Sequence, residues 1–496
     1  MHKQAPIKRG SGGNPAAAIA GLLDLSSWIP LARPEWHAML KALFETFLRH
    51  FEREELARLL EQQREMPAAT SPVERAVRLA SELTALHKVC QMLARNPALP
   101  PEARGALAPL ERLPATAIPD AALKKALALA KRARPALRPD ATEPRIGRGS
   151  VADVFRFIRP AGEGAVAFKS VRADALPRVR HEAAILTEMA DEAATIAAFV
   201  GPDFARTVVE ALRDAARALL REIDFAGEAA NLRDALAFYR LDDHVRVPAV
   251  QGPVLEEGIF MEYVEGSPLL ETPLDAGVRR GMARLLFRSL FLEPLFSGVP
   301  ESIFHADPHA GNILVQKQKN GEVALVLLDW SQADRLPAVV RHAIVELCLH
   351  AMSGENPPAA LLGRILESQG KIRGISFPEE GDPLHKAFKL IEQLAVEGHR
   401  LPLSLLLLRK AFLTLDGIAQ QLDPTFAAWR ETLIYTGWVL ASEAPARVWS
   451  IPFPWWDQRG FYRSGLPTRT LAAWMLRMCR GVPPRLGCGT AARGAS

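Results

Sequence analysis

Cysteines are few in this chain and long apolar runs are missing, and both absences limit what it can be. Its four cysteines, among 496 residues, include no C-x-x-C pair. They therefore supply neither a disulfide framework nor a structural zinc site, and they indicate a reducing compartment. No apolar run approaches the roughly 18 to 20 residues that cross a bilayer, so we expect no transmembrane helix. The short N-terminal apolar run is too interrupted for a signal peptide, so we expect a cytoplasmic protein.

Negative charge is scarce at the end of the chain. From Asp457 to Ser496 there are seven arginines and one aspartate, although the whole chain has a formal net charge of only +5. Aromatic residues are interleaved with these arginines, among them Trp449, Trp455 and Trp456. Two interpretations are open: the segment lies peripherally in a lipid headgroup region, or its aromatics pack on the protein while the arginines stay in water. No nucleic-acid partner is expected, because no binding fold accompanies the basic tail.

Helical periodicity dominates the first part of the chain. Apolar residues recur at helical spacing from Pro34 to about Arg64, which predicts one long amphipathic helix. A second helix is predicted to begin with Ser71 as N-cap and Glu74 as its capping-box partner, and to run toward Asn96.

Alternating β-branched and aromatic residues begin near Glu143, and a mixed α+β organisation follows from them. Beyond Pro268 almost everything is predicted to be helical, apart from two short apolar runs. The predicted strands are 145–157, 165–171, 245–250, 258–264, 313–315 and 323–328, and the predicted helices between them include 177–199 and 202–239.

The most informative polar cluster is F-H-A-D-P-H-A-G-N at 304–312, followed by an apolar strand that ends in Asp329. Phosphoryl transfer requires a carboxylate near the acceptor oxygen and oxygen ligands for Mg²⁺. Asp307, Asn312 and Asp329 supply that set in the order found in kinases. The alternative is a polar loop whose Asp and Asn only cap turns.

Other parts of a kinase lie upstream in the matching order. Gly147, Gly149 and Ser150 form a turn whose small residues let backbone N–H groups approach phosphate. Lys169 lies on an alternating strand, from which a lysine can hold phosphates. Glu262 ends a strand before a turn, as an inter-lobe hinge would. Taken singly, these features also fit a hairpin turn, a solvated lysine and an ordinary strand end.

Together the residues resemble the UbiB/ADCK family of atypical, protein-kinase-like proteins over roughly residues 75 to 430. The segment L-H-K-V-C-Q-M-L at 86–93 looks like the K-x-G-Q motif of the family, with Cys90 in the place of Gly. R-E-I-D-F at 221–225 looks like its E-x-D motif. The loop at 305–312 is similar to its H-A-D-P-H-x-G-N loop, and residues 405–424 resemble its late helix ending in Q-L-D-P.

The resemblance implies a two-lobed, protein-kinase-like α+β fold with an N-terminal helical extension. The expected segments are a helical segment at 1–70, the extension at 71–142, a kinase-like N-lobe with inserted helices at 143–267, a helical C-lobe at 268–445 and a basic, aromatic tail at 446–496.

The resemblance also implies roles for the kinase-like residues. Asp307 would be the catalytic-loop aspartate, and Asn312 and Asp329 would be the Mg²⁺ ligands. Lys169 would contact the nucleotide phosphates and pair with Glu228.

A second group of implied residues is particular to the family. Lys88 and Gln91 would enter the active site from the extension, with Lys88 meeting Glu222 or Asp224. Without the resemblance, Lys88 and Gln91 would be interpreted as the solvated face of an amphipathic helix.

Three departures from the family pattern stand in the sequence. The nucleotide loop, typically A-A-A-S, is G-R-G-S at 147–150, which puts the nucleotide preference and the restraint on protein phosphorylation in question. The D-F-G position is Asp329-Trp330-Ser331, which keeps the metal carboxylate and loses the glycine. Cys90 replaces a glycine, so helix packing there is expected to differ.

As to activity, the resemblance implies Mg²⁺-dependent ATP binding with hydrolysis or phosphoryl transfer, in support of ubiquinone or other isoprenoid-lipid metabolism. ATP or ADP would be the nucleotide, and an isoprenoid lipid or a quinone precursor would be the partner at the inner membrane face. Two alternatives remain open. One is a small-molecule kinase resembling aminoglycoside or choline phosphotransferases, and the other is a nucleotide-gated scaffold without turnover.

Overall fold

A computed structural model describes most of the chain, and its residues fall into two compact units. The described residues are 15–24, 34–94, 120–141, 145–148, 151–160, 164–172, 175–200, 202–318, 322–366, 375–397 and 399–479. One unit contains the described residues up to Phe155 and those of 169–223. The other contains 156–168 and the residues from Asp224 onward. The five segments expected from the sequence stay a prediction.

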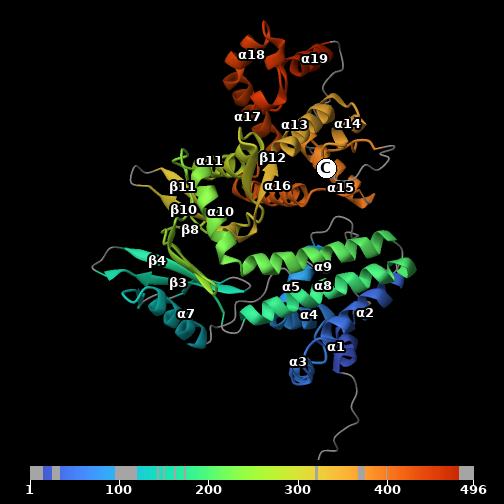
Figure 1. The fold of residues 1–496 in the computed structure, drawn as a ribbon, viewed down its shortest axis with the longest axis vertical. Helices are drawn as coiled ribbons and strands as arrows, with labels where there is room; N and C mark the ends of the chain where they lie inside the picture. The colour runs from blue at the N-terminus through green and yellow to red at the C-terminus, as the bar shows by residue number, and fades with distance from the viewer. Residues whose placement is uncertain are drawn as a thin grey trace, which may run out of the picture. The chain divides into compact units, whose positions relative to one another are not determined.

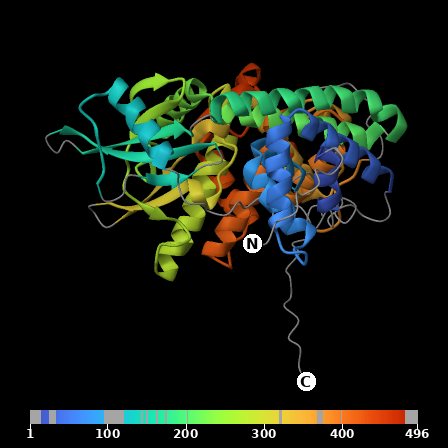
Figure 2. The same cartoon turned by 90° about the horizontal axis from the view of Figure 1, so that it is seen from below.

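The first unit is built mainly of helices. Two long helices, α8 and α9, lie side by side, with α2 and α5 packed against them and α1, α3 and α4 packed on one another (Figures 1 and 2). The contact surfaces are apolar, as the burial of Leu83, Leu186 and Leu219 shows. The helices are α1 (Pro15–Leu23), α2 (Pro34–Arg49), α3 (Arg53–Glu65), α4 (Pro72–Glu82), α5 (Thr84–Ala94), α7 (Asp120–Ala133), α8 (Ala175–Val200) and α9 (Pro202–Glu222).

The single long helix predicted from Pro34 to Arg64 is wrong. The structure divides it into α2 and α3 at Phe51, whose buried ring packs edge-on against Phe47 at 5.1 Å. Phe51 lies at the bend itself and is buried, so the apolar spacing continues from α2 into α3 without a gap. Periodicity reports burial, and a buried corner therefore looks like helix.

The second predicted helix starts as expected and then breaks. Ser71 and Glu74 form the predicted capping box, which is confirmed. The helix stops at Leu83 because α8 holds both sides of the break: Arg178 donates to the carbonyl of Glu82 at 2.6 Å, and Glu182 accepts from the N–H of Ala85 at 2.5 Å. A cation at the end of one helix and a carboxylate at the start of the next both complement helix dipoles.

The predicted helix at 202–239 is also two helices. Asp224 ends α9 and caps α10 (Phe225–Phe238) by accepting from the N–H of Gly227 at 2.9 Å. A Cβ on Gly227 would lie 2.3 Å from the Asp224 carboxylate, so this cap needs glycine there. Short polar residues that accept from the backbone are typical helix starts.

The sheets position the candidate site. A six-stranded sheet has the order β1-β3-β4-β7-β6 with β2 paired to β3, a four-stranded sheet has the order β5-β11-β10-β8, and β12 pairs with β9. The strands are β1 (Arg138–Pro139), β2 (Arg145–Arg148), β3 (Ala152–Ile158), β4 (Ala165–Val171), β5 (Val245–Arg246), β6 (Val250–Leu255), β7 (Gly258–Glu262), β8 (Ser267–Pro268), β9 (Glu301–His305), β10 (Ile313–Lys317), β11 (Val323–Leu327) and β12 (Ala333–Pro337).

Two of these strands correct the prediction that almost everything beyond Pro268 is helical. β9 and β12 pair antiparallel, with His305 opposite Ala333. The two predicted apolar runs form β10 and β11, which pair antiparallel with Ile313 opposite Leu327. The candidate catalytic loop therefore connects β9 to β10, and Asp329 follows β11.

The helices of the second unit pack around an aromatic core. Phe412 of α16 stacks on Phe388 at 4.8 Å and meets Phe291 at 5.3 Å. No helix among the described residues is long and apolar enough to cross a membrane. The remaining helices are α11 (Ala276–Phe287), a π-helix at Arg288–Leu292, α12 (Glu293–Leu295), α13 (Ala338–Ser353), α14 (Ala359–Leu362), α15 (Pro383–Val396), α16 (Leu403–Leu422), α17 (Ala428–Ser442), α18 (Ala444–Ser450) and α19 (Thr468–Cys479), with 3₁₀ turns at 310–312, 330–332, 454–456 and 459–461.

Candidate active site

His305 ties the candidate catalytic loop to the strand that leads to Asp329. Its Nδ1 accepts from the N–H of Asp307 at 3.2 Å, and its Nε2 lies 2.9 Å from the carbonyl oxygen of Leu328. The carbonyl requires a donor, so the proton is on Nε2 and the ring is neutral. Burial lowers the pKa of His305, which favours the same neutral form.

Asn312 joins the same assembly from the other end of the loop. Its Nδ2 donates to the carbonyl oxygen of Asp307 at 3.2 Å, and its own carbonyl oxygen accepts from the N–H of Leu328 at 2.8 Å. Because the amide nitrogen makes this bond, the side-chain oxygen of Asn312 points away from the carbonyl oxygen of Asp307 and can serve as a cation ligand.

Asp329 follows in a backbone conformation that is rare for residues other than glycine. Its φ is 52° and its ψ is 77°, in the left-handed region. One carboxylate oxygen accepts from the hydroxyl of Ser331 at 2.7 Å and from its N–H at 3.3 Å. Such strained positions concentrate at functional sites. Ser331, in the place of a glycine, therefore orients the carboxylate.

Trp330 occupies the middle position of the Asp329-Trp330-Ser331 motif. The side chain is fully buried, its indole N–H donates to the carbonyl of Leu327 at 3.2 Å, and its ring lies 5.0 Å from that of His305. On α10, Asn231 donates to the carbonyl oxygen of Trp330 at 3.0 Å. The tryptophan is an anchor of the turn that carries Asp329.

These residues fit a magnesium ion by the chemistry of their donors. Asn312 and Asp329 offer an amide and a carboxylate oxygen, and Mg²⁺ is a hard cation that prefers oxygen ligands with retained waters. The main-chain oxygen of Asn312 accepts from the N–H of Leu328, the residue before Asp329, so the segments that carry the two side chains are held together.

Lys410 of α16 adds a charged group that the sequence did not single out. Its Nζ lies 2.7 Å from Oδ1 of Asp307, and both side chains are partly exposed. The lysine lies in the segment that resembles the late family helix, but no local spacing connects it to the catalytic loop. Only the packing of α16 reveals the contact.

In the first unit, Lys88 of α5 contacts Glu222 of α9, with Nζ 2.5 Å from Oε1. The sequence left open whether Lys88 meets Glu222 or Asp224, and the structure shows Glu222. Cys90, on the same helix, is buried, and burial raises the pKa of its thiol to about 12. It therefore fills space as an unreactive side chain. The side chain of Gln91 lies outside the described part of α5.

The nucleotide loop is described only in part. Gly147 lies in β2 opposite Val154, and a Cβ there would be 3.5 Å from that side chain. Gly149 and Ser150 lie outside the described residues. Lys169 is buried in β4 and Glu228 is buried in α10. They belong to different units, so their pairing stays a prediction.

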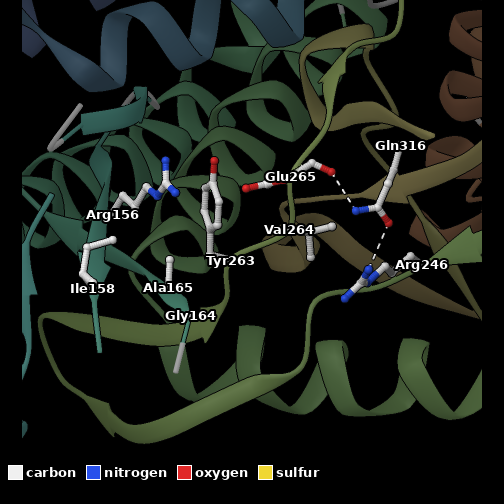
Figure 3. Close-up of a pocket in the computed structure, with 9 residues that line it drawn as sticks. All are labelled: Arg156, Ile158, Gly164, Ala165, Arg246, Tyr263, Val264, Glu265 and Gln316. Atoms are coloured by element: carbon white, nitrogen blue, oxygen red, sulfur yellow. Dashed lines mark hydrogen bonds between the residues drawn. The ribbon is translucent and has the colours of Figure 1, made fainter. Parts of the chain in front are cut away.

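Glu262 occupies a different setting from the other candidates. Its carboxylate pairs with Arg246, and its second oxygen accepts from the N–H of Ala249 at 3.3 Å. Nearby, Figure 3 shows a cavity of about 390 Å³, in which Gln316 donates to the carbonyl of Glu265 and accepts from Arg246. The nine residues that line this cavity include none of the predicted catalytic or metal residues, so we do not place the nucleotide in it.

Some arginines of the C-terminal segment have partners in the helical part. Arg459 pairs with Glu346 of α13, and the main chain of Phe296 accepts from Arg463 at 3.0 Å. Just before the counted arginines, Arg447 pairs with Glu443 at 2.5 Å. The interpretation that the arginines stay in water therefore fails for Arg459 and Arg463 and holds for Arg469, whose side chain is 80% exposed.

Many aromatics of the same segment point outward. Trp449, Phe453, Trp455 and Trp456 form a tryptophan cluster, with ring centroids 5.3 to 6.2 Å from that of Phe453. The three tryptophans expose 51 to 63% of their surface. Tyr462 and Trp474 do pack inward, as one interpretation predicted, and they hold the segment in place.

Comparison with known proteins gives a consistent result. The family model for the ABC1 atypical kinase-like domain matches residues 141–359. Together with the relatives named below, this match confirms the predicted resemblance to the UbiB/ADCK family. It also confirms the predicted kinase-like α+β fold.

UbiB/ADCK relatives match over much of the chain. A "Probable protein kinase UbiB" of Tolumonas auensis is 24% identical over 350 residues, which are 65% of this chain and 63% of that protein. A protein of the same name from Aeromonas salmonicida is 25% identical over 345 residues, or 64% of this chain and 62% of the relative. The match therefore spans less than two thirds of the length of these relatives.

Solved structures resemble the chain more distantly. Rv3197 of Mycobacterium tuberculosis, solved with erythromycin, is 18% identical and covers 75% of this chain and 94% of its own, with a TM-score of 0.41. This score is low, and nothing about the present chain is inferred from it.

Proposed function

We propose that this chain binds ATP with Mg²⁺ and hydrolyses it or transfers its γ-phosphoryl group, in support of ubiquinone or other isoprenoid-lipid metabolism. One observation carries the proposal. Asp307, Asn312 and Asp329 are connected through hydrogen bonds of His305 and Leu328, so that the three groups needed for phosphoryl transfer form one assembly. The resemblance to the UbiB/ADCK family supports the same chemistry.

In the proposed mechanism each residue has one task. Asn312 and Asp329 would hold Mg²⁺, which when bound neutralises charge on the β- and γ-phosphates. Lys169 would orient the phosphates. Asp307 would accept the hydrogen bond of the attacking water or hydroxyl and direct its oxygen toward the γ-phosphorus. Correct placement contributes much of the rate in such reactions, since the transition state is loose.

Lys88, Gln91 and Glu222 would restrict the acceptor. In this proposal the helix with Lys88 and Gln91 covers the site and excludes a large protein acceptor, leaving water or a small lipid-like hydroxyl. The ion pair between Lys88 and Glu222 supports a fixed position for that helix, because both side chains are largely buried and mutually neutralised.

The test follows the γ-phosphate of labelled Mg-ATP, with and without liposomes that contain a quinone precursor. Inorganic phosphate that is released, rises with lipid and disappears in Asp329→Asn would support the proposal. Label on a soluble amino sugar or choline would favour a small-molecule kinase instead. Tight nucleotide binding without turnover would favour a scaffold and contradict the proposed activity.

We further propose that the tryptophan cluster contacts the membrane peripherally. Trp449, Trp455 and Trp456 are exposed, and tryptophan prefers the headgroup region of a bilayer. The only acidic residue from Asp457 onward is itself buried, so this segment presents no exposed carboxylate to anionic lipid.

Sedimentation with vesicles tests this contact. The double variant Trp455→Ser/Trp456→Ser should lose binding to vesicles that contain anionic lipid. Leu241→Ser removes an exposed apolar side chain from the turn that follows α10 and is the control, which should bind as the wild type does. Equal binding by both variants would contradict the proposal.

A further inference from the structure

The contact between Lys410 and Asp307 is the most specific interaction at the catalytic loop. Lys410 Nζ lies 2.7 Å from Asp307 Oδ1, a distance typical of a charge-assisted hydrogen bond. The exposed fractions of the two side chains are 24% and 21%, so solvent and ligands can reach both. The pair is therefore neither a buried structural bridge nor a fully solvated one.

The loop itself has no positive residue that could take this place. Between Arg288 and Lys317 the sequence contains neither Lys nor Arg. The residue two positions after Asp307 is His309, and the other loop positions are apolar, amide or glycine. A cation next to Asp307 must therefore come from elsewhere in the chain, and α16 supplies it.

Helix α16 is well placed to hold such a cation rigidly. Next to Lys410 in sequence, Ala411 and Phe412 are fully buried, and Phe412 contacts three other phenylalanines. Leu408, on the preceding turn, is fully buried as well. The aromatic core thus fixes the backbone of α16 at Lys410, from which the side chain extends toward Asp307.

We propose that Lys410 is a positioning residue of the catalytic loop, which holds the Asp307 carboxylate in the orientation that receives the acceptor O–H. This inference rests on the proposed function. In the reaction the acceptor oxygen bonds to the γ-phosphorus, the bond from that phosphorus to the β,γ-bridging oxygen breaks, and ADP leaves. The acceptor proton passes to Asp307 or water, and Lys410 keeps its own proton throughout.

A cation beside the carboxylate is compatible with this role because phosphoryl transfer needs a strong base less than it needs alignment. Losing the lysine would remove the charge-assisted hydrogen bond to Oδ1 of Asp307 and so weaken the hold on that carboxylate. Misplacement of a reacting group by about 1 Å can cost roughly 10²-fold in rate. Nucleotide binding should not change, because the contacts proposed for the phosphates are made by other residues.

Three variants separate this role from a structural one. Lys410→Met removes the charge, and Lys410→Arg keeps it. Arg409→Met is the matched control, because Arg409 is the adjacent cation on α16 and pairs with Glu392 of α15 instead of the loop. We measure kcat and KM for ATP, the Kd of the nucleotide, and the urea midpoint of unfolding for each purified full-length protein.

We expect Lys410→Met to lower kcat by about 10²-fold while the nucleotide Kd stays at the wild-type value. Lys410→Arg should recover most of the rate, and Arg409→Met should keep all of it. If Lys410→Met lowers kcat no more than Arg409→Met does, or if its loss follows from weaker nucleotide binding or a lower urea midpoint that Lys410→Arg does not restore, the inference is wrong.

The same experiment distinguishes failure of the inference from failure of the proposed function. Wild-type turnover that survives in Lys410→Met overturns the role of Lys410 alone. A wild-type protein that binds nucleotide and turns over nothing, with or without liposomes, overturns the proposed function and this inference with it.

Discussion

The catalytic loop and the C-terminal segment both gather charged side chains, and they use them in opposite ways. At the loop, Asp307 and Lys410 meet where both remain partly exposed. In the C-terminal segment, Glu443 and Asp457 are buried and are surrounded by donors. The difference teaches that the accessibility of a charge, and not its number of contacts, separates groups available for chemistry from groups used to hold the fold.

Asp457 shows how completely the structural charges are satisfied. Burial alone would raise the pKa of Asp457, but hydrogen bonds from the N–H groups of Arg469 and Thr468 and from the hydroxyl of Tyr462 lower it. Glu443 likewise accepts from the N–H and the hydroxyl of Ser464 as well as from Arg447. Each of these buried carboxylates accepts three hydrogen bonds within the protein, and burial keeps a ligand from reaching it.

The largest effect should come from removing a charge at the loop. Asp307→Asn should lower turnover by about 10²- to 10⁴-fold, because a positioned acid–base group contributes that much. The urea midpoint should not fall, because the carboxylate is partly exposed. Single-turnover assays with labelled Mg-ATP check the rate, and Asp243→Asn, at an exposed aspartate, is the control. An active Asp307→Asn would show that the accessible charge at the loop is not used for chemistry, and the contrast with the C-terminal segment would fail.

The next effect concerns pH and the anchoring of the C-terminal segment. Burial and the nearby Arg341, Arg459 and Arg364 lower the pKa of His342 to about 4 from its ordinary 6.5. The unfolded chain therefore binds this proton first as pH falls, and stability is lost between about pH 6.5 and 4, by about 3 kcal/mol in total.

His342→Asn should lack this loss, which urea unfolding at pH 7.5, 6 and 5 measures. The free-energy advantage of the wild type over the variant should shrink toward low pH. Parallel curves would mean that His342 takes up its proton in the folded protein as readily as in the unfolded chain. Gly465, whose φ is +66°, packs directly against this ring, so the variant keeps a planar side chain of smaller size.

A smaller effect is expected from the buried carboxylate of the segment. Asp457→Asn should lower the free energy of unfolding by about 1.5–3 kcal/mol, the range for hydrogen bonds to a charged group. Turnover per folded molecule should be unchanged, since Asp457 is part of the anchoring of the segment. Urea unfolding and the ATP assay are performed on the same protein. A loss of turnover without a loss of stability would contradict the assignment.

The smallest effect should come from the outward tryptophans. Trp455→Ala should change the free energy of unfolding by no more than about 0.5 kcal/mol, as exposed positions usually do. Trp474→Ala is the internal comparison, because Trp474 is buried and its truncation should cost about 3–5 kcal/mol. Equal losses for both variants, measured in urea, would show that the exposed ring also stabilises the fold.

Local signals in the sequence predicted local structure well. The capping box of Ser71 and Glu74 lies within one helical turn, so its residue types alone determine it. The same signals failed at Phe51 and Leu83, where burial continues across a break. At Leu83 the break depends on Arg178 and Glu182, which come from a helix far along the chain.

The residues of the candidate site also fall into those that the sequence revealed and those that only the packing revealed. The spacing from Asp307 to Asn312 could be recognised because both residues belong to one loop, and the order of the kinase-like residues gave the family. Lys410 could not be found, because nothing in the spacing of α16 indicates which loop it meets. The partners of Arg459 and Arg463 were also missed, because sequence periodicity predicts that charged residues are exposed.

By itself, the sequence determined the kinase-like order of its motifs, the capped helix start and the basic, aromatic character of its last segment. Only the tertiary structure decided that His305 connects Asp307 to the residue before Asp329, that Lys410 meets Asp307, and that Arg459 of the last segment pairs with Glu346. The physical reason is range. Hydrogen bonds within a turn follow from neighbouring residue types, whereas contacts between distant segments depend on how the whole core packs.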